Sequence, residues 1–141
     1  MSVYKIFIAF TLGLLTVSAN AAQFDVQRPL LCAIQQIDEC TAGEDCVGVT
    51  PQSVSLPDFL WIDLANKRVT SAGTQALTSS PIKGVERMNG KLIIQGGDAA
   101  GNNPRGGVGW TLSLNEATGK MTIAGVADGF AMIVFGSCIQ E

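Results

Sequence analysis

The chain has 141 residues, with 12 acidic and 9 basic side chains, a net charge of −3 and no histidine. The acidic excess and the lack of a Lys/Arg cluster argue against nucleic acid or an anionic lipid surface as a partner. Without histidine, Ser-His-Asp and Cys-His nucleophiles, histidine general bases and most zinc catalysis are excluded.

Residues 1–21 have the three zones of a secretory signal peptide. Lys5 supplies a positive charge, residues 6–17 form an apolar run, and Ala19 and Ala21 have the A-x-A spacing that signal peptidase reads. A transmembrane anchor is the alternative, but the run is too short, because a bilayer span needs about twenty residues. We therefore expect a cleaved signal and no stable membrane insertion after cleavage.

Cleavage before Ala22 would leave one mature domain, residues 22–141, in the periplasm or outside the cell. Lys5 leaves with the signal, so 8 basic residues face 12 acidic ones and the mature charge is −4. A chain of this length suits a single domain with one hydrophobic core.

The mature chain consists of short apolar runs separated by Gly, Asn, Asp or Pro, which is typical of strands joined by turns. Asn89-Gly90 marks the clearest hairpin, because this pair favours the positive φ angles of a two-residue turn. Alternation predicts inward side chains at Val108, Trp110, Leu112 and Leu114, and at Met121, Ile123 and the small Gly125. We expect strands at residues 30–37, 46–50, 59–64, 68–71, 82–87, 91–95, 108–114, 120–126 and 130–136.

Eight or nine short strands with mostly hairpin connections predict an all-β fold. An antiparallel meander must hide its edges, and closure into a barrel does so. The first choice is therefore a small antiparallel eight-stranded barrel, and the alternative is a two-sheet β-sandwich.

The four cysteines, Cys32, Cys40, Cys46 and Cys138, all lie in the mature chain. An even number in a small exported domain indicates disulfides, and three pairings are possible. We favour Cys40–Cys46, which closes a short polar loop, and Cys32–Cys138, which joins the first strand to the last. A metal site is disfavoured, because the spacing is not C-x-x-C and histidine is absent.

Carboxylates are the remaining catalytic candidates, as in glycosidases or aspartic proteases. Asp58, Asp63, Glu86 and Asp98 have no spacing that singles out a pair. We interpret them as solvated residues at turns and strand ends, and predict no catalytic residue, no cofactor and no metal.

Residues 96–107 form the longest predicted loop, and its glycines suggest a phosphate cradle. The loop lacks the Gly-Lys-Ser/Thr ending and no helix follows it, so a surface loop is favoured. If the protein binds a partner, the loop's polar side chains are the first candidates. They are Asp98, Asn102, Asn103 and Arg105.

Four acidic residues, Asp38, Glu39, Glu44 and Asp45, surround the predicted short disulfide. Oxygen ligands at this density could hold calcium. Their order does not match an EF-hand, so a solvated acidic tip is favoured.

Trp61 and Trp110 lie in predicted strands, where packing in the core is the default for tryptophan. In the segment 59–64 one phase of the alternation is Phe59, Trp61 and Asp63, and the other is Leu60, Ile62 and Leu64. If its leucines and isoleucine fill the core, Phe59 and Trp61 form an exposed aromatic pair and a candidate partner-binding patch.

Residues 50–60 (TPQSVSLPDFL), residues 109–121 (GWTLSLNEATGKM) and the closing 135–138 (FGSC) resemble a group of small exported proteins of Gram-negative bacteria. The resemblance implies export and brings no chemistry. A remoter likeness, in size, export, cysteines and strand count, is to the periplasmic inhibitors of c-type lysozyme, which are disulfide-bonded eight-stranded barrels. Their Ser-Gly-x-x-Tyr loop is missing here, so no inhibitory residue is carried over.

The sequence therefore predicts a non-enzymatic periplasmic binding module that engages a protein or a small ligand through loops at a barrel end. A lipocalin-like carrier of a small apolar ligand is the alternative. A carboxylate-based hydrolase is the weakest of the three hypotheses.

Overall fold

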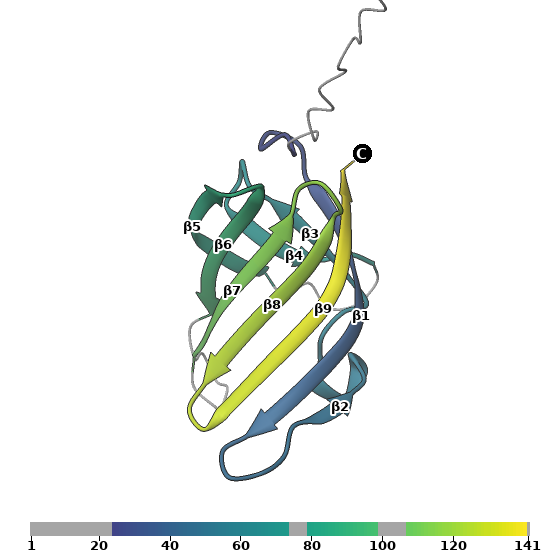
Figure 1. Ribbon diagram of the computed structural model, residues 1–141, viewed down its shortest axis with the longest axis vertical. Helices are drawn as coiled ribbons and strands as arrows, with labels where there is room; N and C mark the ends of the chain where they lie inside the picture. Colours follow the sequence, from purple (N-terminus) through teal and green to yellow (C-terminus); the bar gives the residue numbers. More distant parts are fainter. Residues whose placement is uncertain (1–23, 74–78, 99–106, 141) are drawn as a thin grey trace, which may run out of the picture.

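The structure is a computed structural model that describes residues 24–73, 79–98 and 107–140 (Figure 1). The predicted signal peptide lies outside these residues. The described chain forms nine strands and one 3₁₀ helix. They are β1 (Leu30–Thr41), β2 (Val47–Val49), η1 (Gln52–Val54), β3 (Phe59–Asp63), β4 (Arg68–Ser71), β5 (Ser79–Met88), β6 (Lys91–Asp98), β7 (Val108–Asn115), β8 (Lys120–Ala127) and β9 (Phe130–Gln140).

The strands form an antiparallel barrel, which confirms the first of the two predicted architectures. The sheet order is β2-β1-β3-β4-β5-β6-β7-β8-β9, and β1 also pairs with β9. This last pairing closes a ring of eight strands, β1 and β3–β9 (Figure 1). A closed ring leaves no free edge, whereas a two-sheet sandwich would leave four.

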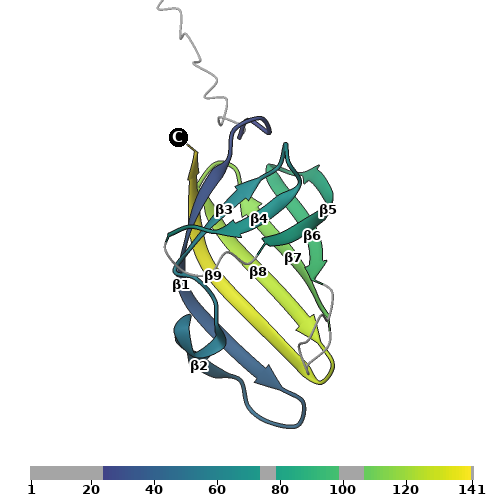
Figure 2. The same ribbon diagram turned by 180° about the vertical axis from the view of Figure 1, so that it is seen from behind.

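Strand β1 has two partners along one of its edges. Leu30–Ala33 pairs with β3 inside the ring, and Ile37–Glu39 pairs with β2 outside it. A register shift between Ile34 and Gln36 in the pairing with β9 separates the two halves. Strand β2 is therefore an addition to the barrel, and Figure 2 shows it beside the second half of β1.

The first and last strands are longer than predicted. β1 continues past Ile37 to Thr41, and β9 continues past Gly136 to Gln140, because each is the other's hydrogen-bonding partner over this whole length. Likewise β5 begins at Ser79 rather than Ile82, since Ser79 and Ser80 pair with β4.

The barrel interior is filled by one cluster of buried side chains, and predicted inward positions of β7 and β8 are among them. Leu112, Leu114 and Met121 are fully or almost fully buried. Trp110 packs against the cluster, as predicted, and its indole N–H donates to Ser80 Oγ at 2.7 Å. The cluster comprises Leu30, Cys32, Leu60, Ile62, Leu64, Ile82, Leu92, Ile94, Leu112, Leu114, Met121 and Cys138.

Residues 24–29, the amino-terminal segment, cover one end of the barrel. Phe24 and Val26 pack against the core cluster. The side chain of Gln140 holds the segment: its Oε1 accepts from Asp25 N at 2.8 Å, and its Nε2 donates to the carbonyls of Asp25 and Arg28 at 2.7 and 2.9 Å. We call this end, where β9 finishes, the closed end.

A charged pair completes the closed end. Arg87 Nε donates to Glu116 Oε1 at 3.1 Å, and the Glu116 side chain is buried. A second guanidinium nitrogen of Arg87 donates to the Phe24 carbonyl at 2.5 Å. Arg87 therefore connects β5, the turn after β7 and the amino-terminal segment.

Both favoured disulfides are present. Cys32–Cys138 links β1 to β9 across a sequence separation of 106 residues, and Cys40–Cys46 spans 6 residues at the far end of β1. The hairpin at Asn89-Gly90 is also confirmed, with φ angles of 50° and 72°.

Candidate functional site

The outer face of the barrel carries an apolar patch across β9, β1 and β3. Leu31 stands opposite Ile139 of β9 and Trp61 of β3 in the strand register, and Phe59 lies two residues before Trp61. Phe59 is 46% exposed and Ile139 is 60% exposed, whereas Leu31 and Trp61 are half-buried. We call these four residues the outer apolar patch.

The patch faces outward because the alternate residues of the same strands are buried in the barrel core. Leu30 and Cys32 flank Leu31 and are completely buried. On β3, Leu60 and Ile62 are buried, so the condition set for an exposed Phe59–Trp61 pair is met. A tryptophan at an outward position packs on its strand neighbours and keeps part of its ring in water.

Strand β9 extends the apolar character along the barrel. Its outward positions from Ala131 to Ile139 include Ile133 and Phe135, and Ser137 is the one polar side chain among them. Phe135 is 40% exposed. An antiparallel sheet with one solvated face normally alternates apolar and polar residues, so an apolar outward phase is unusual.

A shallow depression borders the patch at Trp61. It has a volume of about 290 Å³ and is lined by Pro29, Trp61, Asp63, Arg68 and Thr70. Asp63 and Arg68 face each other in the register of β3 and β4. The patch therefore has an apolar centre and, on this side, a charged edge.

The Asp63 carboxylate belongs to a turn rather than to a catalytic pair. It accepts from the side-chain and backbone N–H groups of Asn66 at 2.7 and 2.9 Å. These bonds, the Asn66 side chain first, and the nearby Arg68 lower the pKa of Asp63 below its ordinary value of 3.8.

The other carboxylate candidates are dispersed. Asp58 precedes β3 and accepts from Gln52 Nε2 at 3.0 Å, Glu86 is exposed on β5, and Asp98 is exposed at the end of β6. Each lies on a different element, so the structure does not bring them together as a pair.

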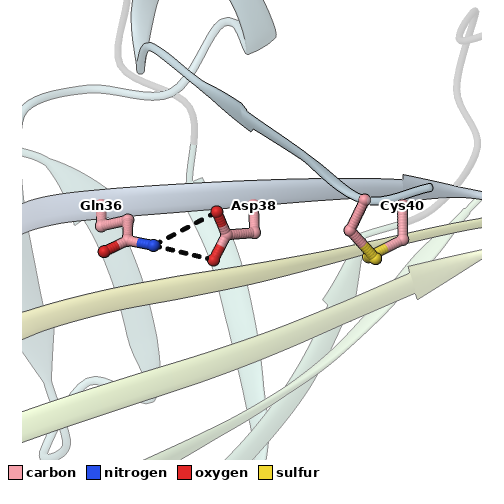
Figure 3. The surroundings of a disulfide bond; sticks show 4 residues. Gln36, Asp38 and Cys40 are labelled. Carbon is pink, nitrogen blue, oxygen red and sulfur yellow. Dashed lines mark hydrogen bonds between the residues drawn. A yellow bond between two sulfur atoms is a disulfide. The ribbon is translucent and has the colours of Figure 1, made fainter.

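The second half of β1 has a polar outer face. Gln36, Asp38 and Cys40 follow one another on the same side of the strand (Figure 3). Gln36 Nε2 donates to both Asp38 carboxylate oxygens, at 3.2 and 2.9 Å. Glu44 and Asp45 are exposed in the turn beyond, and residues 24–73, 79–98 and 107–140 contain no acidic or cysteine cluster suited to a metal ion.

Of the candidates in the predicted loop, Asp98 is described, and it is exposed at the end of β6. Strand β6 runs past the predicted end at residue 95, because residues 96–98 pair with β7. Asn102, Asn103 and Arg105 lie outside the described residues. Strands β4 and β5 separate β6 from β3 in the sheet order, so Asp98 and the Phe59–Trp61 pair belong to different parts of the surface.

Sequence reasoning identified Phe59 and Trp61 but missed Leu31 and Ile139. Both lie next to cysteines of the long-range disulfide, Cys32 and Cys138. Once those cysteines point inward, their neighbours must point outward. This signal was available in the sequence, because the Cys32–Cys138 pairing was already favoured.

Comparison of the chain with protein-family models, curated proteins and solved structures finds no match. Among the described residues, none forms a helix long and apolar enough to cross a membrane. Fold and surface together define a class: a small, disulfide-bonded, all-β barrel with an apolar patch on its outer wall.

Proposed function

We propose that this protein is a non-enzymatic binding module of the periplasm or the extracellular space, and that its outer apolar patch contacts a protein partner. The observation that carries the proposal is the exposure of Phe59 and Ile139 beside Leu31 and Trp61 on one face. Contiguous apolar side chains on the surface of a small domain mark interaction sites, because water contact with them is unfavourable.

A protein suits this surface better than a small molecule does. Small ligands bind in concave pockets that bury most of their surface, whereas the patch lies on the outside of a barrel wall. Aromatic side chains with a polar rim are typical of protein interfaces. Phe59 and Trp61 provide the aromatic anchors, and Asp63 and Arg68 provide charge at the edge.

The interior supports an outside contact. Twelve buried residues form one cluster inside the ring, and the depression beside Trp61 lies on the outside of the barrel wall. A lipocalin-like carrier holds its ligand in a cavity inside the barrel, whereas side chains fill the interior here, so this packing favours a contact outside the barrel. We therefore place the proposed contact on the barrel wall, and the predicted contact through the loop of residues 96–107 stays the alternative.

The proposed location rests on cysteine usage and on the leader sequence. Both disulfides are of the kind that forms and persists in oxidising compartments. Residues 1–21 supply the export signal, and the resemblance to small exported proteins of Gram-negative bacteria points the same way.

The test is capture of a partner by the exported, mature protein. The double variant Phe59→Ser/Ile139→Ser removes the two most exposed side chains of the patch without touching the core cluster. We expect a crosslinked partner from periplasmic extract, and at least a ~30-fold weaker affinity for the variant, since interface anchors contribute about 2 kcal/mol or more.

Met88→Ser is the matched control, because Met88 is 56% exposed at the β5–β6 turn, away from the patch. It should bind the partner as the parent does. Equal binding by the patch variant and the parent, with both folded by circular dichroism, would refute the proposal.

A variant lacking residues 97–106 tests the loop prediction separately. Loss of the partner on loop deletion, with full binding by Phe59→Ser/Ile139→Ser, would return the contact to the loop. Light scattering of the purified protein tests whether the patch instead binds a second copy of this chain. A concentration-dependent dimer that the patch variant abolishes would show this.

A further inference from the structure

A second depression lies at the closed end of the barrel and shares no lining residue with the outer apolar patch. It has a volume of about 310 Å³ and is lined by Val26, Leu64, Lys67, Ile82, Lys83, Gly84 and Val85. Figure 2 shows the amino-terminal segment and the turn between β3 and β4 at this same end. Segments far apart in the chain therefore build its wall.

The floor of this depression is apolar. Leu64 and Ile82 belong to the buried core cluster, and Val26 packs against that cluster from the amino-terminal segment. Val85 is 41% exposed and adds an apolar wall that water reaches.

The charged groups of this depression are both cations. Lys67 and Lys83 line it, and no carboxylate does so. Among the described residues, the one ion pair is Arg87–Glu116, so neither lysine is neutralised by a described carboxylate. The opening of this depression is therefore locally positive on a chain whose net charge is −3, which favours an anion there.

The backbone holds both lysines at this mouth. Lys67 ends the β3–β4 turn at a φ of 52°, and its carbonyl accepts from Ile82 N at 2.9 Å, which ties the turn to β5. Lys83 is the extra residue where the pairing of β5 with β6 shifts between Ile82 and Gly84. A bulge of this kind re-aims a side chain at one position of a strand.

We propose that this depression binds a small amphipathic anion: an alkyl chain of about six to ten carbons, as its volume allows, with a carboxylate at one end. The chain contacts Val26, Leu64, Ile82 and Val85, and the carboxylate lies between Lys67 and Lys83. The site does not depend on the outer apolar patch, so it stands or falls separately from the proposed protein contact.

Octanoate is the probe. Octanol, which has the alkyl chain without the charge, and acetate, which has the charge without the long chain, are the controls. Titration followed by amide shifts in a ¹H–¹⁵N NMR spectrum should show saturable binding of octanoate, with the largest shifts at Gly84 and Val85. Octanol should bind several-fold more weakly, and acetate should not bind at millimolar concentration.

The double variant Lys67→Gln/Lys83→Gln should weaken octanoate about tenfold and leave octanol unchanged, because two exposed ion pairs of ordinary strength are lost. Lys91→Gln/Lys120→Gln removes the same charge from residues outside the depression and should leave octanoate binding intact. Equal weakening by both double variants, absence of saturable octanoate binding, or shifts centred on Trp61 would each overturn the proposal.

Discussion

The two ends of the β1–β9 ribbon show how differently one pair of strands can be stabilised. At the closed end, Cys32 and Cys138 stand opposite each other, are 0% and 3% exposed, and lie within the core cluster. At the other end, Cys40–Cys46 is bordered by exposed residues and by the three-residue strand β2. The first bond reinforces the strand pairing that closes the barrel, whereas the second only fastens an appendage to it.

The largest expected effect is loss of the closed-end disulfide. In the chain-entropy model, a link across 106 residues stabilises by about 5 kcal/mol. Cys32→Ala/Cys138→Ala should lose this amount or more, because two buried side chains are also shortened. Urea denaturation followed by circular dichroism measures the change, and a loss below 1 kcal/mol would remove the contrast between the two ends.

The disulfide at the other end should contribute less. For a separation of 6 residues the same model gives about 2 kcal/mol. We expect Cys40→Ser/Cys46→Ser to keep the barrel and to raise hydrogen exchange in β2 and the second half of β1. A loss of stability equal to that of Cys32→Ala/Cys138→Ala would mean that β2 is part of the cooperative core.

Removal of the Gln140 side chain should have a smaller effect at the closed end. Gln140→Ala abolishes three hydrogen bonds to the amino-terminal segment, all of them exposed, so about 1 kcal/mol is expected. Faster exchange should be confined to Asp25 and its neighbours. Unchanged exchange there would show that packing of Phe24 and Val26 alone holds the segment.

The smallest effect concerns Asp63 and depends on pH. Its folded pKa is lowered, so its carboxylate contributes stability above its ordinary pKa of 3.8, and this contribution is lost as pH falls through the folded value. Asp63→Ala should lower the melting temperature slightly at pH 7 and not at pH 2. An equal difference at both pH values would assign the loss to packing.

Local sequence signals predicted much of the fold. The Asn89-Gly90 turn and the inward phase at Leu112, Leu114 and Met121 depend on neighbouring residues, and each is confirmed. The disulfides were predictable because Cys40 and Cys46 are close in sequence, which leaves Cys32 and Cys138 as partners.

The features that sequence reasoning missed depend on distant residues. The full lengths of β1 and β9 follow from their pairing with each other across the whole chain. The bulge at Lys83 follows from the register between β5 and β6, and no local pattern marks it. In 59–64 the phase of Phe59 and Trp61 also holds Asp63, so a weak local signal for its outward direction existed, and closure of the ring around Leu60, Ile62 and Leu64 decides it.

The hydrogen bonds between Asp25 and Gln140 bring the two ends of the described chain together. A short linker could therefore join them, and new termini could be opened at the exposed Asn89-Gly90 turn. Such a circular permutant would make neighbours of the strands that now begin and end the chain. The β1–β9 pairing would then become local, and the β5–β6 pairing, which covers fewer residues, would become the long-range contact that closes the ring.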